Sequence, residues 1–363
     1  MSKRNVFLRL WDYLRQYKGA LFLAVFLKIF SSVMSVLEPF VLGLAITELT
    51  SNLMDMAHGV AGAHLNISYI AIILVLYFVR GMGYGLSSYG SNFFITKAVQ
   101  KTIHDLRRDL SEKINKIPVS YFDSQQFGNV LGRFTSDVET VSNALQQSFL
   151  RIIEAFTTIT LVICMVLYLN WRLALVVIAI IPITYLSAKF ILGKSQPYFK
   201  EQADALGDMN GFVQENLSGF NVIKLYGREE ISSQEFREIT QNLQEVGFKA
   251  SFISGIMMPA LSAISDMAYL IIAVLGALQV LSGQLTVGNM QAFVQYVWQV
   301  SQPVQTITQL ASVLQSAKSS LDRIFEVLDE PEEAAQVTEK LVHDLSGQVT
   351  FENVSSNMLL INH

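Results

Sequence analysis

Cysteine is almost missing from this chain of 363 residues, which contains only Cys164. A single cysteine cannot close an internal disulfide, and its apolar surroundings favour a small buried side chain. The five histidines show no ligand spacing, and the sequence contains no His-Glu-x-x-His pair, serine elbow or paired intramembrane aspartates, which disfavours an intramembrane enzyme. Lys and Arg number 26 against 30 Asp and Glu, so no basic excess points to nucleic-acid binding.

A phosphate-binding loop is missing as well. No G-x-x-x-x-G-K-[ST] occurs, and the nearest stretch, Gly193 to Ser195, ends an apolar helix. The chain therefore shows no residues that could hydrolyse ATP. Its sequence predicts no catalytic residue, cofactor or metal ion of its own.

Apolar residues, in contrast, make up 51% of the chain, while charged residues make up 15%. This is more apolar surface than one soluble core hides, so a membrane protein is the first hypothesis. Six segments approach or exceed the ~20 residues that a helix needs to cross the hydrocarbon core. They are residues 19–46, 67–94, 152–169, 173–192, 253–281 and 287–314.

The positive charges alternate along the connections between these spans. Lys and Arg precede the first span and crowd the second and fourth connections, whereas the first and fifth contain none and the third only Arg172. This alternation predicts a multi-pass protein of the plasma membrane with six spans and both termini in the cytoplasm.

The N-terminal residues 1–18 predict an amphipathic helix that lies in the cytoplasmic membrane interface, with Arg9 turned away from its apolar stripe. A helix docked on a protein partner is the alternative. The stripe consists of Phe7, Leu10, Trp11 and Leu14.

The two long connections, residues 94–151 and 194–252, keep a helical period and contain few helix breakers. At about 1.5 Å per residue, such helices would reach several tens of Å beyond the membrane. In the first connection, "IPVSYFDSQQFGNVLGRFTSDVETV" is broken by Pro118 and punctuated by Gly128 and Gly132. The pattern predicts a turn, a short transverse helix and a return helix.

These residues resemble the first intracellular loop of the ABC exporter family, in which the transverse segment is a coupling helix that rests on an ATPase domain. Three further stretches resemble the family in order and spacing: residues 215–236, 281–304 and 317–333. The resemblance implies ATPase contacts in the first loop at Tyr121, Phe122, Asp123, Gln126 and Phe127, and in the second loop at Gly227, Arg228 and Glu229.

The resemblance also implies a fold and partners. The fold would be an all-α ABC transporter type-1 transmembrane fold, and its partners would be membrane lipids, a second half-transporter, identical or related, and nucleotide-binding domains that bind ATP and Mg. A second-loop coupling helix would reach the ATPase domain of the other chain. The implied organisation is an interfacial helix at 1–18, the transmembrane domain at 19–325, a linker at 326–346 and the first strand of a nucleotide-binding domain within 347–363.

After Ser355 the family pattern fails, because Ser356 and Met358 stand where the family places aromatic residues. We interpret the end of the sequence as a natural or engineered truncation, or as a frameshift. The leading function is the membrane domain of an exporter that moves amphipathic drugs, lipids or peptides by alternating access. The alternative is a truncated regulatory subunit that pairs with a full-length relative and blocks it.

Charged residues inside spans are costly and often functional. Asp266 is a candidate for a cationic substrate contact or a proton-linked switch, with a structural hydrogen bond as the alternative. Glu154, another substrate-cavity candidate, lies one turn from Arg151, which favours a local salt bridge. The apolar candidates for the same cavity are Met267, Phe293, Tyr296 and Trp298, for which helix packing is the alternative.

Overall fold

The computed structural model describes residues 5–61, 64–124, 127–333, 350 and 352, and the described chain is all-helical, as the sequence predicts. The predicted linker at 326–346 begins as helix, since α10 continues to Asp329, and its part from 334 lies outside the described residues. Most of the predicted strand region at 347–363 lies outside them too. The elements are α1 (Val6–Leu14), the 3-10 turn η1 (Arg15–Tyr17), α2 (Lys18–Ala57), α3 (Ile67–Ile114), α4 (Val119–Ser124), α5 (Phe127–Gly132), the π-helical η2 (Arg133–Asp137), α6 (Val138–Leu169), α7 (Trp171–Ser218), α8 (Phe220–Leu225), α9 (Glu229–Leu281) and α10 (Val287–Asp329).

Five helical stretches are long and apolar enough to cross a membrane, and they contain the first five predicted spans. α10 has the length but not the composition, because glutamines recur through its first half. The count of six spans therefore stays a prediction. The five stretches are Val6–Ala57, Ile67–Ile114, Val130–Leu169, Trp171–Ser218 and Glu229–Leu281.

Short polar turns start the next helix by side-chain capping. Asn66 accepts from the backbone N–H of Tyr69 at the start of α3, and Thr286 accepts from Asn289 at the start of α10. Asn170 does the same for α7, where Arg172 and Leu173 donate. A capping side chain satisfies N–H groups that the first helical turn leaves without partners, so each of these helices begins directly after its turn.

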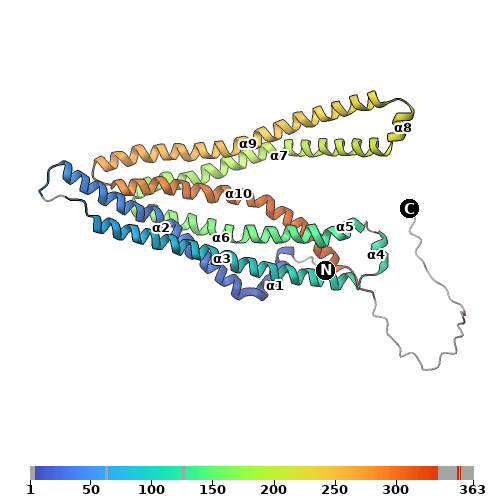
Figure 1. Ribbon diagram of the computed structural model, residues 1–363, viewed down its shortest axis with the longest axis horizontal. Coiled ribbons are helices and arrows are strands. Elements are labelled where there is room, and N and C mark those ends of the chain that lie inside the picture. The colour runs from blue at the N-terminus through green and yellow to red at the C-terminus, as the bar shows by residue number, and fades with distance from the viewer. Residues whose placement is uncertain (1–4, 62–63, 125–126, 334–349, 351, 353–363) are drawn as a thin grey trace, which may run out of the picture.

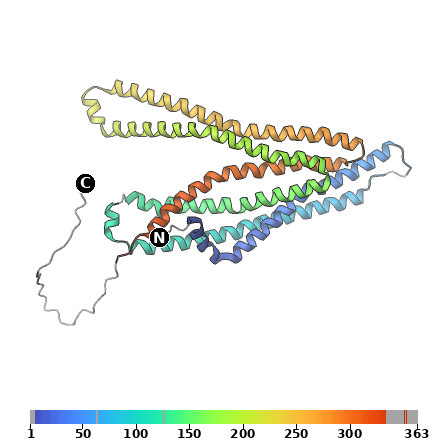
Figure 2. The same cartoon turned by 180° about the vertical axis from the view of Figure 1, so that it is seen from behind.

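The long helices form a body and an arm (Figures 1 and 2). The body contains α2, α3, α6 and α10, and the arm is the antiparallel pair of α7 and α9, closed by α8. The two parts meet at one end of the molecule, which we call the narrow end, and diverge toward the other, which we call the broad end. The two tips of the broad end, α4 with α5 and α8, therefore lie apart.

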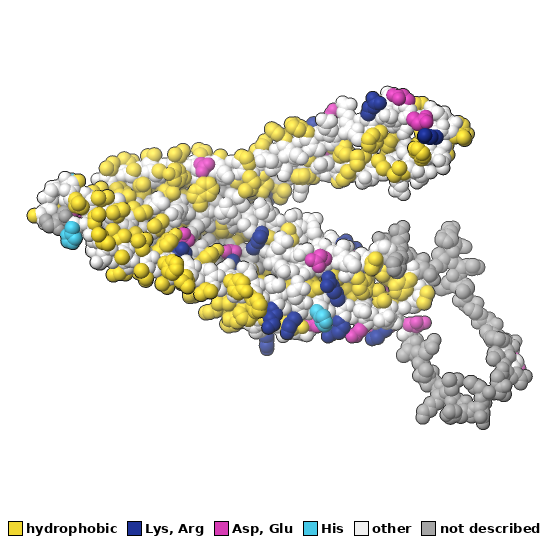
Figure 3. All heavy atoms as spheres, viewed as in Figure 1, with side chains coloured by type: hydrophobic (Ala, Val, Ile, Leu, Met, Phe, Trp, Pro, Cys, Tyr) yellow, Lys and Arg dark blue, Asp and Glu magenta, His cyan; other side chains and the backbone are white. Residues whose placement is uncertain are grey.

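Two clusters of buried side chains hold this arrangement. One lies toward the broad end of the body and joins α1, α2, α3, α6 and α10 around residues such as Leu106, Val138 and Leu321. The other joins α2 and α6 to the arm through α10, with Phe293 and Tyr296 fully buried at its centre. On the surface, hydrophobic side chains cover the region near the narrow end, and charged side chains gather toward the broad end (Figure 3).

The N-terminal helix α1 docks on the body. Leu10 and Leu14 are buried in the first cluster, whereas Phe7 and Trp11 of the predicted stripe are exposed. Arg9, predicted to turn away from this stripe, binds the body: its Nη1 lies 2.6 Å from Asp329 Oδ2, and its guanidinium stacks 4.0 Å from the centre of the Phe325 ring. α1 thus binds the end of α10 with one face and leaves an apolar face free for the membrane interface.

Candidate functional site

The first tip lies at the broad end of the body and consists of α4, α5 and η2. The predicted break is confirmed, because α3 ends at Ile114 and α4 begins directly after Pro118, which has no N–H to continue a helix. Gln126 lies outside the described residues, and Asp123 and Phe127 are described only as backbone positions in α4 and α5. Their contact with an ATPase domain stays a prediction.

Two aromatic residues connect this tip to the body. Tyr121 and Phe122 are half-buried against the first cluster and pack edge to face, with ring centres 5.6 Å apart. Arg133 of η2 donates to the Tyr121 hydroxyl, and its Nη2 lies 3.3 Å from Glu326 Oε2 of α10. A force on α4 would therefore reach α10 through packed side chains.

A second link between η2 and α10 is a buried carboxylate. Asp137 accepts from Arg323 Nε at 2.9 Å and from Ser320 Oγ at 2.9 Å. Burial opposes ionisation of Asp137, but the hydrogen bonds from Arg323 and Ser320 and the positive charge of Arg323 hold the pKa of this carboxyl below its ordinary value. π-helical segments are rare overall, but they occur often at functional positions. Here η2 lies between α5 and α6 and is bound to α10 through Asp137.

The second tip is α8, which turns the chain from α7 to α9 at the broad end of the arm (Figure 1). Gly227 adopts a φ of +60°, which favours glycine, and Arg228 and Glu229 start α9 as exposed residues. The apolar side chains beside them are also exposed, with Leu225 82% and Tyr226 74% accessible. An apolar surface at the end of a long arm is a surface for a partner.

Two ion pairs lie between helices of the body within the predicted spans. Lys28 of α2 is buried, and its Nζ lies 2.7 Å from Glu154 Oε2 of α6. The predicted local pair of Glu154 with Arg151 is therefore wrong, because a buried ammonium from another helix has the greater need of a carboxylate. Glu38 of α2 binds Arg80 of α3 at 3.1 Å and accepts from the Tyr77 hydroxyl at 2.8 Å.

The other predicted cavity residues do not meet in one site. Phe293 and Tyr296 are fully buried among helices, so they pack α10 and do not line an open cavity. Met267 and Trp298 are exposed on α9 and α10, and Asp266 lies on the exposed surface of α9. Within the described residues, Asp266 makes no hydrogen bond or ion pair, so the structural bond considered as its alternative is not formed inside this part of the chain.

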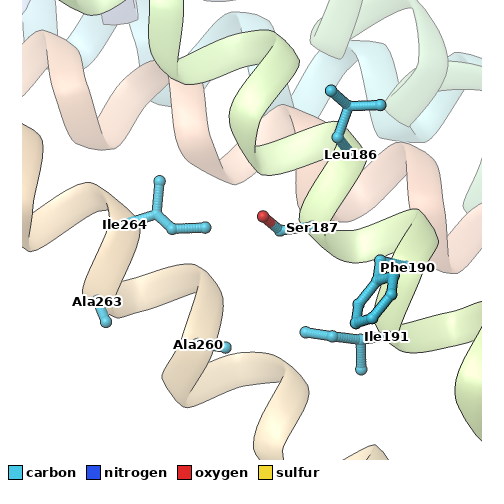
Figure 4. A pocket seen from close by; sticks show the side chains of 7 residues that line it. All are labelled: Leu186, Ser187, Phe190, Ile191, Ala260, Ala263 and Ile264. Atoms are coloured by element: carbon cyan, nitrogen blue, oxygen red, sulfur yellow. The ribbon is translucent and has the colours of Figure 1, made fainter.

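An open apolar hollow of about 570 Å³ lies between α7 and α9. Ile264 of α9 and Ser187 of α7 point toward each other across it (Figure 4). No group of three or more His, Cys, Asp or Glu side chains in the described ranges is arranged to hold a metal ion. The lining suits an apolar guest or a lipid chain, and it consists of Leu186, Ser187, Phe190, Ile191, Ala260, Ala263 and Ile264.

Comparison with known families explains this arrangement of body, arm and tips. Residues 21–304 match the model of the ABC transporter transmembrane region. The chain belongs to this family. The resemblance drawn from the loops is thereby confirmed, and so is the all-α ABC transmembrane fold. The chain is a multi-pass membrane domain, and domains of this kind act with nucleotide-binding domains and a partner half.

Relatives agree on the family and differ in their reported cargo. A fatty acid ABC transporter ATP-binding/permease protein of Mycobacterium tuberculosis is 34% identical over 79% of this chain and 44% of its own length. The uncharacterized ABC transporter ATP-binding protein YfiC of Bacillus subtilis is 31% identical over 96% of this chain and 56% of its own. An ATP-dependent lipid A-core flippase of Aromatoleum aromaticum is 26% identical over 92% of this chain and 55% of its own length. The chain thus spans about half the length of the curated relatives it matches.

Several residues that shape this ABC transmembrane domain escape the sequence prediction. The hollow of the arm is one, although Ala260 and Ala263 recur at a spacing that puts small side chains on one helix face. The exposed Leu225 and Tyr226 are another, and their signal is a run rich in apolar residues, from Phe220 to Tyr226, that lies far from the predicted spans. Pairing across helices, as in Lys28 with Glu154, leaves no comparable signal in one sequence.

Proposed function

We propose that the chain is the membrane-spanning half of an ATP-driven exporter of amphipathic, lipid-like molecules. It would work with a second half and with ATPase domains that bind ATP and Mg, with the broad end in the cytoplasm. The observation that carries this proposal is the pair of separate tips at the broad end, one on the body and one on the arm, of which α8 presents exposed Leu225 and Tyr226. Each of the two separated tips would contact one ATPase domain, and the tips would move as these domains approach and separate.

The surface of the arm supports the need for a partner half. Toward the broad end, beyond the predicted spans, α7 and α9 expose large apolar side chains such as Leu206, Leu217 and Phe248. Outside the membrane, exposed large apolar side chains that gather on one element mark a surface for another protein. In a symmetric dimer of this chain, a single interface would cover this surface on both copies.

The lipid-like cargo is supported by the open apolar hollow between α7 and α9 and by the names of two relatives, a fatty acid transporter and a lipid A-core flippase. Drugs and peptides are the cargo classes that compete with it. All three classes share an apolar body that the hollow fits, so the preference for a lipid-like cargo rests on the names of the two relatives.

The test is transport by the chain continued into an ATP-binding domain and reconstituted in lipid vesicles. Fluorescent fatty acids and phospholipids, a cationic dye and a hydrophobic peptide are supplied separately, with ATP and Mg or with a non-hydrolysable analogue. We expect movement of the lipid-like probes that needs hydrolysis. Absence of ATP-linked movement for every class would refute the exporter proposal, and movement of dye or peptide alone would refute the lipid-like cargo.

A further inference from the structure

Pro39 lies inside α2, in the half of that helix toward the narrow end. A proline has no backbone N–H, so the carbonyl oxygen of Ser35, four residues earlier, lacks the donor that a regular α-helix would give it. A carbonyl without a donor is costly in a membrane-spanning helix, because no water reaches it there. This carbonyl needs a donor from elsewhere.

Gln299 of α10 supplies that donor. Its Nε2 donates to the Ser35 carbonyl oxygen at 3.2 Å. Its Oε1 is buried and has no hydrogen-bond partner within the described part of the chain. The Gln299 side chain is therefore held in place by the hydrogen bond that its Nε2 donates to Ser35.

The neighbouring carbonyls of α2 also accept from other helices. The Tyr296 hydroxyl of α10 donates to Val36 at 3.0 Å, and Arg80 Nη1 of α3 donates to Met34 at 2.9 Å. These two carbonyls, unlike that of Ser35, still face a backbone N–H four residues on, because those residues are not proline. Only the bond from Gln299 replaces a donor that the helix itself lacks.

Closer to the narrow end, α2 and α10 remain in contact. The backbones of Gly43 and Gly288 touch, and the Thr47 hydroxyl donates to Thr286 Oγ1 at 3.1 Å. If α10 moved away from α2, the Ser35 carbonyl would lose its donor. If residue 39 were not proline, its backbone N–H would still donate to the Ser35 carbonyl after such a movement.

We propose that Pro39 and Gln299 form a reversible latch that keeps the narrow end closed. Gln299 is a positioning residue: it holds α10 against α2 by satisfying the carbonyl that Pro39 leaves open, and the narrow end opens when this bond breaks. The proposal rests on the proposed alternating access, in which the narrow end must open during each cycle. The residues that form the latch, however, all belong to this chain.

The test measures closure of the narrow end by disulfide cross-linking. Cysteines replace Thr47 and Thr286, whose hydroxyl oxygens are 3.1 Å apart, in the full-length protein in nanodiscs with Cys164→Ala. The rate of cross-linking without nucleotide is compared for wild type and Gln299→Met. Since the latch is one hydrogen bond, we expect Gln299→Met to lower the rate by roughly twofold to tenfold.

A second pair of variants isolates the role of the proline. Pro39→Ala restores an N–H for the Ser35 carbonyl, so adding Gln299→Met in that background should change the cross-linking rate little. Gln302→Met, on the exposed face one turn along α10, is the matched control and should leave the rate unchanged. If Gln299→Met does not fold, Gln299→Asn, with its shorter reach, is put through the same comparison.

Two results would overturn the latch. One is an unchanged rate on substitution of Gln299, and the other is an equal loss whether Pro39 is kept or replaced by alanine. Neither readout depends on a substrate or on ATP. A failure of the latch is therefore distinguishable from a failure of the exporter proposal, which the vesicle assay measures.

Discussion

The contact between Gly43 of α2 and Gly288 of α10 leaves no room for a side chain on either residue. A Cβ on Gly288 would lie 1.7 Å from the carbonyl oxygen of Gly43 and 2.3 Å from Thr47 Oγ1. Ordinary van der Waals contact of a Cβ begins near 3.4 Å. Gly288→Ala therefore requires the two backbones to move apart, because a carbonyl oxygen in a helix cannot rotate away.

Forcing extra methyl groups into a filled contact costs about 1–3 kcal/mol when side chains can adjust. The clash here is with backbone, so we expect the upper part of that range. In soluble domains of 150–250 residues, each kcal/mol lowers the melting temperature by about 2–4 °C. A fall of several degrees is expected for Gly288→Ala, measured by tryptophan fluorescence of the purified protein in detergent micelles.

Two other glycines serve as graded controls. Gly85→Ala should not lower the melting temperature, since no described atom lies within 4 Å of its Cβ position and alanine is the better helix former, and Gly276→Ala should have an intermediate effect, since it meets the flexible side chain of Met290 at 2.8 Å. A melting temperature of Gly288→Ala that is no lower than those of Gly85→Ala and the wild type would contradict the backbone clash.

The remaining predictions concern the ion pairs and the second tip. Lys28→Met should lower the melting temperature by leaving Glu154 without its cation, and adding Glu154→Gln should recover part of the loss; no recovery would contradict the pair. Because the pKa of Asp137 is lowered in the folded protein, its bond to Arg323 stabilises the fold above the ordinary carboxyl pKa and loses this effect as pH falls through the lowered value. The stability difference between wild type and Asp137→Asn in pH-dependent melting should thus be largest near neutral pH and shrink below about pH 4; a difference that grows in acid would contradict this. Leu225→Asp should lower transport per ATP hydrolysed without changing the melting temperature, since the side chain is exposed, and unchanged coupling would remove α8 from the ATPase contact.

The architecture is predictable because its signals are local. Run length and apolar composition locate the first five spans, and Pro118 with the following glycines locates the first tip. Side chains such as Asn170 mark helix starts by bonding to residues two and three positions along. Each of these features is decided within a few residues of sequence.

The interior is less predictable because it depends on which helix faces which. Glu154 has Arg151 at a helical spacing in sequence, yet it binds Lys28 of α2. Phe293 and Tyr296 suit a cavity by composition, but α10 lies among other helices, so the same side chains fill its packing. Likewise, the Gly81-x-x-x-Gly85 pattern is typical of close helix contact, but within the described residues no atom lies within 4 Å of a Cβ added at either glycine.

α10 shows how position in the bundle decides composition. It packs on α2, α6, α7 and α9, so much of its surface meets protein where the other helices meet lipid. Polar side chains are tolerated there when they find partners, and Ser301 and Gln305 are buried in this helix near Gln299. Glutamines spaced by three or four residues thus lower the hydropathy of α10 below that of the five apolar stretches. The same spacing places an amide donor opposite the one α2 carbonyl that a proline has deprived of its own, which makes the low hydropathy of α10 a sign of its contacts with neighbouring helices.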